Sequence, residues 1–242
     1  MENIDICSLL RSNRYPGRGL FIGRSLDNNK ATIAYFIMGR SENSRNRIFV
    51  PTDDGIRTQA HDPGKMTDSS LIIYHPVRRV DIGDEMYYVV SNGDQTDTIR
   101  DFYLNDKNYA DALLTRTFEP DAPNFTPRIS AVLLPHGSYM LSILKLMKGT
   151  VDSCSRQFFV YDTPAPGTAH FIHTYIGDGT PLPAFEGEPV LVALPDGNSE
   201  QIAQEIWKSL DSENKVSLYL AEVDIKTGNL ESMIIKNKNN GD

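Results

Sequence analysis

Residues 87–100, with the sequence YYVVSNGDQTDTIR, carry an unusual concentration of hydrogen-bonding side chains directly after an apolar run. The first four residues are aromatic or β-branched, which predicts a buried strand. The SNGD that follows predicts a tight turn, because Asn and Gly tolerate positive φ and Asp caps its own backbone. The remaining polar residues indicate either a solvated loop with a helix N-cap at Thr96 or Asp97, or a rigid polar platform for a small ligand.

A second polar stretch, residues 39–47, contains Arg40, Arg45 and Arg47 together with small polar residues, and it lies between two predicted strands. The planar guanidinium group presents a fork of donors that suits phosphate. The stretch therefore predicts either a solvated loop or an anion-binding loop that takes the place of a P-loop.

Other common catalytic chemistries find little support in the sequence. His170 and His173 lie three residues apart on a predicted strand, so their side chains point to opposite faces and are poorly placed to share a metal. Cys154 falls in a predicted turn, where a bystander role is favoured over that of a nucleophile. The chain has no G-x-S-x-G, P-loop or CxxC motif. We therefore predict a site without metal or cofactor.

The net charge of −8 argues against nonspecific binding to nucleic acid or to anionic membranes, because both need a positive field. An anionic ligand must instead be bound by a local group of arginines. The N-terminus lacks the basic and apolar segments of a signal peptide, and no apolar run approaches the roughly 20 residues of a membrane span. We expect a cytoplasmic protein that binds neither nucleic acid nor membrane.

Hydrophobic periodicity and turn residues predict a chain that is rich in strands and has few helices. Helices are expected at 1–14, 108–118 and 199–210, the last with a capping box formed by Asn198 and Gln201. Residues 51–70 are expected to be loop. The predicted strands are 20–24, 31–38, 48–50, 71–74, 77–82, 86–90, 129–134, 139–146, 157–161, 169–175, 190–194, 216–223 and 230–235.

Several of these strands are apolar on both faces, which implies sheets that are covered on both sides. We therefore predict an α+β fold in which mostly antiparallel sheets form a four-layer α-β-β-α sandwich. A β-sandwich with peripheral helices is the alternative. No linker, repeat or low-complexity segment interrupts the sequence, so residues 1–242 are expected to form one domain.

SNGDQTDTI at 91–99, together with TPRISA at 126–131, resembles the archaeal-type IMP cyclohydrolase family. YPGR at 15–18, Arg40 and Ser41 with Arg45, Tyr74 and Glu119 match the family in the same order along the chain. These matches cover residues 15–131. From residue 135 onward only the length and the β-rich pattern agree.

The resemblance implies a fold like that of the N-terminal nucleophile hydrolases. Those hydrolases expose a nucleophile at the mature N-terminus, whereas Cys7 stands behind six residues here, and a cyclohydrolase requires no such nucleophile. The implied reaction is closure of the purine ring of formamidoimidazole carboxamide ribonucleotide (FAICAR) to give IMP and water. A nucleotide-binding regulatory module without turnover and an amide hydrolase of the same fold are the alternatives.

The resemblance also implies roles for individual residues. Glu119 is expected to be the general acid and base, and Tyr74 to donate a hydrogen bond to the formyl oxygen or to Glu119. The residues expected to be catalytic are Glu119, Tyr74 and Arg45, and those expected to bind the substrate are Arg18, Arg40, Ser41, Asn92, Asp97 and Arg128.

Each of these assignments has a structural alternative. Tyr74 can be a core residue, Arg128 can form a structural bridge with Asp97, and Glu119 can face water. The expected partner is a purine nucleotide. The resemblance favours a homo-oligomer, although the sequence shows no interface stripe.

Overall fold

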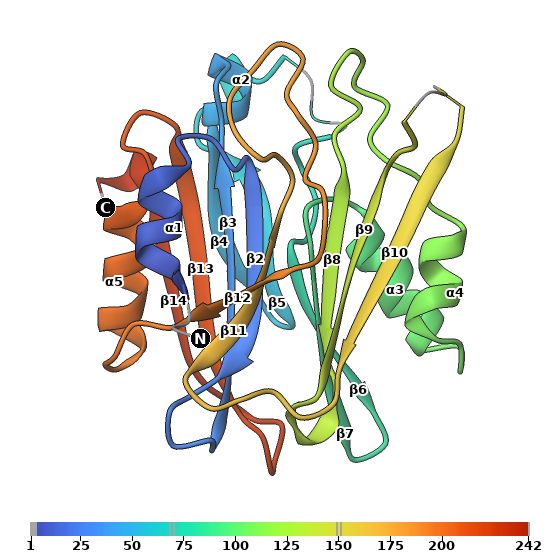
Figure 1. The fold of residues 1–242 in the computed structure, drawn as a ribbon, viewed down its shortest axis with the longest axis vertical. Helices are drawn as coiled ribbons and strands as arrows, with labels where there is room; N and C mark the ends of the chain where they lie inside the picture. The colour runs from blue at the N-terminus through green and yellow to red at the C-terminus, as the bar shows by residue number, and fades with distance from the viewer. Residues whose placement is uncertain (1–3, 68, 70, 149, 151, 242) are drawn as a thin grey trace.

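The computed structural model describes residues 4–67, 69, 71–148, 150 and 152–241, and it contains two seven-stranded sheets that pack face to face (Figure 1). The order of strands in the first sheet is β1 (Ile4–Asp5), β12 (Val190–Ala193), β11 (Thr168–His173), β2 (Arg18–Arg24), β3 (Lys30–Met38), β13 (Lys215–Asp224) and β14 (Leu230–Asn237). The order in the second is β10 (Cys154–Tyr161), β9 (Tyr139–Leu146), β8 (Arg128–Leu133), β7 (Glu85–Ser91), β6 (Val77–Ile82), β5 (Gly55–Ala60) and β4 (Arg47–Thr52).

Neighbouring strands in both sheets run antiparallel, except that β1 and β12 are parallel. This confirms the prediction of an α+β fold with mostly antiparallel sheets. No helix among the described residues is long and apolar enough to cross a membrane.

Strand β3 shows why its sequence is apolar on both faces. Ile33 and Tyr35 belong to the core between the sheets, whereas Ala34 and Phe36 belong to a second core between the first sheet and its helices. Side chains on a strand alternate between its faces, so an uninterrupted apolar run is buried on both. The predicted double cover of this strand is confirmed.

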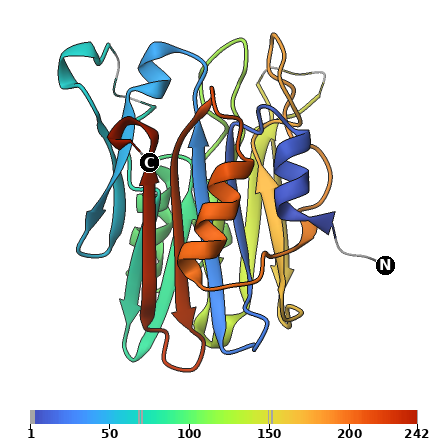
Figure 2. The same ribbon diagram turned by 90° about the vertical axis from the view of Figure 1, so that its left-hand side faces the viewer.

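Helices lie on the outer face of each sheet. α1 (Ile6–Ser12) and α5 (Ser199–Ser209) lie side by side against the first sheet (Figure 2), and α3 (Gln95–Tyr103) and α4 (Tyr109–Leu114) cover the second (Figure 1). The remaining helical segments are short: α2 (Glu42–Arg45), η1 (Pro63–Lys65), η2 (Pro135–Gly137) and η3 (Lys238–Asn240). Asn198 and Gln201 form the capping box predicted for α5.

The predicted helix boundaries differ from those of the structure at three places. The helix expected at 1–14 spans only Ile6–Ser12 within the described residues, because Asp5 accepts hydrogen bonds from the first turn as N-cap; residues 1–3 lie outside the described part. The helix expected at 108–118 ends at Leu114. Helix α3 begins at Gln95, after Asp94, so the expected N-cap at Thr96 or Asp97 is wrong.

The loop expected at 51–70 instead contains strand β5, apart from residues 68 and 70, which lie outside the described part. The strand is hard to recognise because only its alternate residues Ile56 and Thr58 are buried. Residues 71–74 do not form the expected strand. The Thr58 backbone N–H donates to the Tyr74 carbonyl, and the Tyr74 N–H donates to the Thr58 side-chain hydroxyl. Cys154 begins β10 and does not lie in a turn.

Replacing Asn198 with Ala should lower the free energy of unfolding by about 1 kcal/mol. Its Oδ1 accepts a hydrogen bond from the Gln201 N–H at 3.0 Å, and the variant loses this cap. Urea unfolding followed by circular dichroism measures the change. Asn198→Ser, which keeps a capping oxygen, is the matched control and should unfold close to the wild type; an alanine variant as stable as the wild type would contradict the assignment.

Candidate active site

Glu119 lies in the loop between α4 and β8, and its side chain is only 2% exposed. Its Oε2 lies 3.3 Å from the Arg18 guanidinium, which belongs to the first sheet. Its Oε1 accepts a hydrogen bond of 3.4 Å from the side-chain amide of Asn92, which directly follows β7 of the second sheet. The carboxylate therefore connects the two sheets. The alternative that Glu119 faces water is wrong.

Burial raises the pKa of Glu119 above its usual value, although the positive charge of Arg18 opposes this effect. A carboxyl group whose pKa is raised exchanges its proton closer to neutral pH. The same geometry holds the group in place, because the Glu119 backbone N–H donates to the Thr126 carbonyl at 2.9 Å. The site thus contains a fixed carboxyl group that can both accept and release a proton.

Asn92 joins the two segments that carry the sequence motifs. Its Oδ1 accepts hydrogen bonds from the backbone N–H of Ile129 at 2.8 Å and from Gln95 at 3.1 Å. Its Nδ2 donates to the carbonyl of Pro127 at 2.9 Å. Every polar atom of this fully buried side chain is used, so the turn after β7 forms a rigid platform and is not a solvated loop.

Arg128 is buried and clamps the same turn from the other side. Its guanidinium donates to Asp94 at 2.8 Å and to Gln95 at 2.6 Å. A Cβ atom added at Gly93 would lie 2.3 Å from this guanidinium, so only a glycine at position 93 leaves enough space for the Arg128 side chain. Arg128 therefore does pair with a carboxylate, but with Asp94 and not with Asp97.

Asp97 lies outside this group. Its carboxylate pairs with Arg78 at 2.9 Å and approaches His75 at 3.5 Å, and its side chain is 42% exposed. The two carboxylates have different partners, because Asp94 pairs with Arg116 and Arg128 whereas Asp97 pairs with Arg78. The structure does not bring Asp97 to Glu119.

Tyr74 is a core residue, which was the alternative considered from the sequence, but it also lies beside the platform. Its hydroxyl is 2.8 Å from the hydroxyl of the fully buried Tyr35, and either can donate. A cavity of about 10 Å³, close to the minimum space for one water, separates Tyr74 from the platform. It is lined by Leu71, Tyr74, Gly93, Asp94, Glu119 and Arg128.

The other predicted residues, Arg40, Ser41 and Arg45, are exposed and bound to their own surroundings. Arg40 donates to Asp178 and to the Gly179 carbonyl and lies over the Tyr15 ring. Ser41 is the N-cap of α2.

The guanidinium of Arg45 donates to the Gly39 carbonyl at 2.8 Å and to Asn214 at 3.0 Å. It also lines a separate surface hollow with Asp62 and Asn239. These contacts hold the loop after β3 together, and they do not join Arg45 to the group around Glu119.

Three residues near Glu119 were given no role of their own from the sequence: Tyr35, Arg47 and Tyr175. Tyr35 stands in an apolar strand, and Arg47 stands in a polar stretch from which its burial could not be read. The Tyr175 hydroxyl is hydrogen-bonded to that of Thr126, beside the Glu119 loop. The TPR motif pointed to Thr126, but no feature of the sequence pointed to its partner Tyr175.

His170 and His173 have separate partners. His170 Nδ1 lies 2.8 Å from the Tyr139 hydroxyl, and His173 Nδ1 lies 2.7 Å from the Tyr175 carbonyl. In the part of the chain that the structure describes, no group of three or more His, Cys, Asp and Glu side chains could hold a metal ion.

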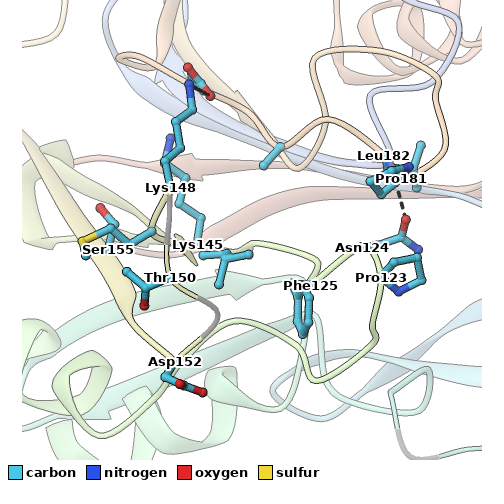
Figure 3. Close-up of a pocket in the computed structure, with 14 residues that line it drawn as sticks. Pro123, Asn124, Phe125, Lys145, Lys148, Thr150, Asp152, Ser155, Pro181 and Leu182 are labelled. Carbon is cyan, nitrogen blue, oxygen red and sulfur yellow. Dashed lines mark hydrogen bonds and ion pairs between the residues drawn. The ribbon is translucent and has the colours of Figure 1, made fainter.

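A larger hollow of about 840 Å³ adjoins the loop that follows Glu119 (Figure 3). Residues 123–125 form one side of it, and Lys145 and Lys148 on and after β9 lie opposite. Asn124 accepts a hydrogen bond of 3.1 Å from the backbone of Leu182, which closes a third side. Its size is within the range of small-molecule pockets.

A family model described as IMP cyclohydrolase-like protein matches residues 15–228. No curated protein matches the chain. Among solved structures, the chain is similar to Anbu from Hyphomicrobium sp. strain MC1, with 12% identity and a TM-score of 0.39. That alignment covers 90% of this chain and 87% of the other.

Replacing Asn92 with Ala should lower the free energy of unfolding by about 1–3 kcal/mol, because it leaves the buried Ile129 N–H and Pro127 carbonyl without partners. Urea unfolding measures the change. Asn105→Ala is the matched control: this exposed asparagine bonds only locally to the Asp101 carbonyl, so its loss should cost less than about 0.5 kcal/mol. Equal stability of the two variants would contradict the role of Asn92.

Proposed function

Because the chain belongs to the IMP cyclohydrolase-like protein family, we propose that it is an IMP cyclohydrolase, which converts FAICAR to IMP in the last step of inosinate synthesis. The observation that carries the proposal is the buried carboxyl group of Glu119, held between Arg18 and Asn92. Ring closure needs a fixed proton carrier of this kind at the reacting amide.

The reaction joins two groups of one molecule. The carboxamide nitrogen attacks the formyl carbon, a C–N bond forms, and a proton passes from that nitrogen to the formyl oxygen. The C–O bond of the resulting carbinolamine then breaks, the hydroxyl takes up a proton and leaves as water, and the adjacent nitrogen loses its proton. The enzyme must orient the two groups, carry protons and stabilise charge on the formyl oxygen.

We assign proton transfer to Glu119, which as a carboxylate accepts a proton from the carboxamide nitrogen and as an acid delivers it to the formyl oxygen. In the second step it takes the proton that the nitrogen loses and supplies it to the departing hydroxyl. Tyr74, which lines the same cavity as Glu119, donates a hydrogen bond to the formyl oxygen. Asn92 and Arg128 hold the platform and the Glu119 loop in position. Asp97 contributes through Arg78, at a distance from the reacting groups.

For the ribose phosphate we propose Arg18, Arg40, Ser41 and Arg45, on the basis of charge and donor geometry. Arg40 and Arg45 must then exchange contacts with protein oxygens for contacts with the nucleotide. The cavity at Glu119 is also smaller than a nucleotide, so binding must move one of its walls.

We also propose that residues 1–242 form a single domain whose two sheets between helix pairs correspond to the four-layer N-terminal-nucleophile-hydrolase-like sandwich. In this assignment Cys7 does not act as an N-terminal nucleophile, because it is buried in the core between α1 and the first sheet.

The direct test is absorbance-monitored conversion of FAICAR to IMP by the purified protein, with and without a chelator. Conversion that survives chelation supports a metal-free cyclohydrolase. IMP binding without conversion would replace the proposal with a regulatory module, and neither binding nor conversion would refute it.

Glu119→Gln should lower kcat by about 10²-fold or more, because an amide cannot carry the proton, while IMP affinity stays largely intact. Steady-state assay and calorimetry measure the two effects. Glu200→Gln is the matched control: its side chain is 60% exposed and pairs with Lys236, so kcat should not change. Normal turnover of the Glu119 variant would remove Glu119 from the mechanism.

Arg45→Ala should weaken IMP binding by about 10-fold or more, the usual loss when a hydrogen bond to a charged group is removed. Calorimetric titration with IMP measures the change. Arg57→Ala, at an exposed arginine that bonds to Gln59, serves as the control and should bind like the wild type. Unchanged affinity of the Arg45 variant would refute its role as a phosphate anchor.

A further inference from the structure

Arg24 is the last residue of β2 and lies at the end of this strand away from Glu119. Arg18, which pairs with Glu119, begins the same strand, and a rise of about 3.3 Å per residue places the two arginines about 20 Å apart. Leu20 and Ile22 between them belong to the core between the sheets, so strand alternation directs the Arg24 side chain into the same space. Each end of β2 thus places an arginine between the sheets.

The guanidinium of Arg24 is buried with few partners. The residue is 7% exposed, and its Nη2 donates to the His136 carbonyl at 3.0 Å. Its Nε and Nη1 are buried and have no hydrogen-bond partner within the described part of the chain. Among the same residues, no carboxylate lies within 4.0 Å of this guanidinium. Burial lowers the pKa of Arg24, as expected for a charge that lacks a counter-charge.

The backbone of the second sheet is shaped around this group. A Cβ atom added at Gly137 would lie 2.7 Å from Cζ of Arg24 and 2.8 Å from each of its terminal nitrogens. Gly137 has φ +82°, and His136 before it also has a positive φ, of 65°, which a residue with a side chain seldom adopts. The turn between β8 and β9 therefore leaves space that the arginine of the first sheet occupies.

The neighbouring polar side chains do not balance the charge. Tyr139 interacts electrostatically with Arg24, and its hydroxyl lies 2.8 Å from Nδ1 of His170. The ring of Tyr161 stacks on that of His170, with centroids 3.6 Å apart. Burial lowers the pKa of His170 to about 4, so this imidazole is neutral near pH 7. The cluster thus joins both sheets and holds a positive charge that no carboxylate contacts.

We propose that Arg24 anchors an oxyanion-binding site, in which its Nε and Nη1 donate to a phosphate or carboxylate group of a small molecule. A buried charge without a counter-charge is costly, and a water molecule would satisfy the donors but not the charge. Hydrogen bonds from a guanidinium to an anionic oxygen satisfy both. The site is separate from the group around Glu119 and does not rest on the proposed function.

Arg24 also lines a surface hollow of about 760 Å³, which is large enough for a small metabolite. Of the two cations in this lining, Lys30 pairs with Glu222 at 3.2 Å, whereas Arg24 pairs with no carboxylate. The lining also contains the exposed carboxylates of Asp27 and Asp196, which favour a compact anionic group over a large polyanion. Because both free donors are buried, binding requires a local movement of the Arg24 side chain or of the residues that cover it.

Calorimetric titration of the wild type and of Arg24→Met with inorganic phosphate and with acetate tests the site, in the absence and in the presence of saturating IMP. IMP blocks phosphate binding at the proposed catalytic site. The IMP-bound wild type should still bind an oxyanion, and Arg24→Met should lose about 10-fold or more of this affinity. Binding of phosphate alone assigns the site to a phosphorylated molecule, and binding of acetate assigns it to a carboxylate.

Thermal unfolding separates a ligand site from a structural role. The bound oxyanion should raise the melting temperature of the wild type and leave that of Arg24→Met unchanged. Arg24→Lys keeps the charge without the fork of donors, and it should retain part of the affinity should the methionine variant fail to fold. Arg57→Met, at an exposed arginine, is the matched control and should bind oxyanions like the wild type.

Two results would overturn the inference: an IMP-bound wild type that binds neither phosphate nor acetate, or equal binding by the wild type and Arg24→Met. A methionine variant that melts earlier but binds oxyanions like the wild type would show a structural role only. A protein that neither binds IMP nor converts FAICAR would refute the proposed function, while the titrations without IMP would still compare the two proteins at Arg24.

Discussion

The ion pair between Arg18 and Glu119 is the constraint on which the site depends, because both groups are removed from water between two sheets. A buried ion pair rarely stabilises a protein by itself, since the cost of desolvation offsets the attraction. It requires further hydrogen bonds, and the Asn92 side-chain amide donates one to the carboxylate. The Glu119 backbone N–H also donates to the Thr126 carbonyl, which holds the loop. The hydrogen bonds that stabilise the Glu119 carboxylate therefore also fix the positions of the turn after β7 and the start of β8.

The same region carries more positive charge than it needs for its own balance. Arg128 is neutralised by Asp94, and Arg18 by Glu119, but Arg47 has no carboxylate of its own among the described residues. An apolar side chain at position 47 would avoid this cost of burial.

Sequence patterns predicted the features that depend on local physics. The two-sided apolar run of β3 and the capping box of Asn198 are examples. The SNG and TPR segments pointed to Asn92 and Glu119 as separate candidate site residues, and the hydrogen bond between them was seen only in the structure. What they could not predict depends on distant contacts. Arg47 stands among polar residues typical of a loop, and its burial follows only from the packing of β4. The choice of Asp94 over Asp97 as the partner of Arg128 depends on distant arginines, because Arg78 of β6 pairs with Asp97.

The two sheets contribute different parts of the site, with Arg18 and Tyr35 on the first and Asn92, Arg128 and Arg47 at or beside strands of the second. Each sheet is internally held by its own ladder, whereas their mutual alignment rests on side-chain packing and on a few side-chain contacts such as the Arg18–Glu119 ion pair and the hydrogen bonds of Asn237 to the Phe49 backbone. A shear of one sheet along the other would preserve strand content but separate the two halves of the site. The contacts between the side chains of the two sheets therefore depend on how the sheets are aligned. Mild loosening of the core would separate these side chains well before the strands are lost.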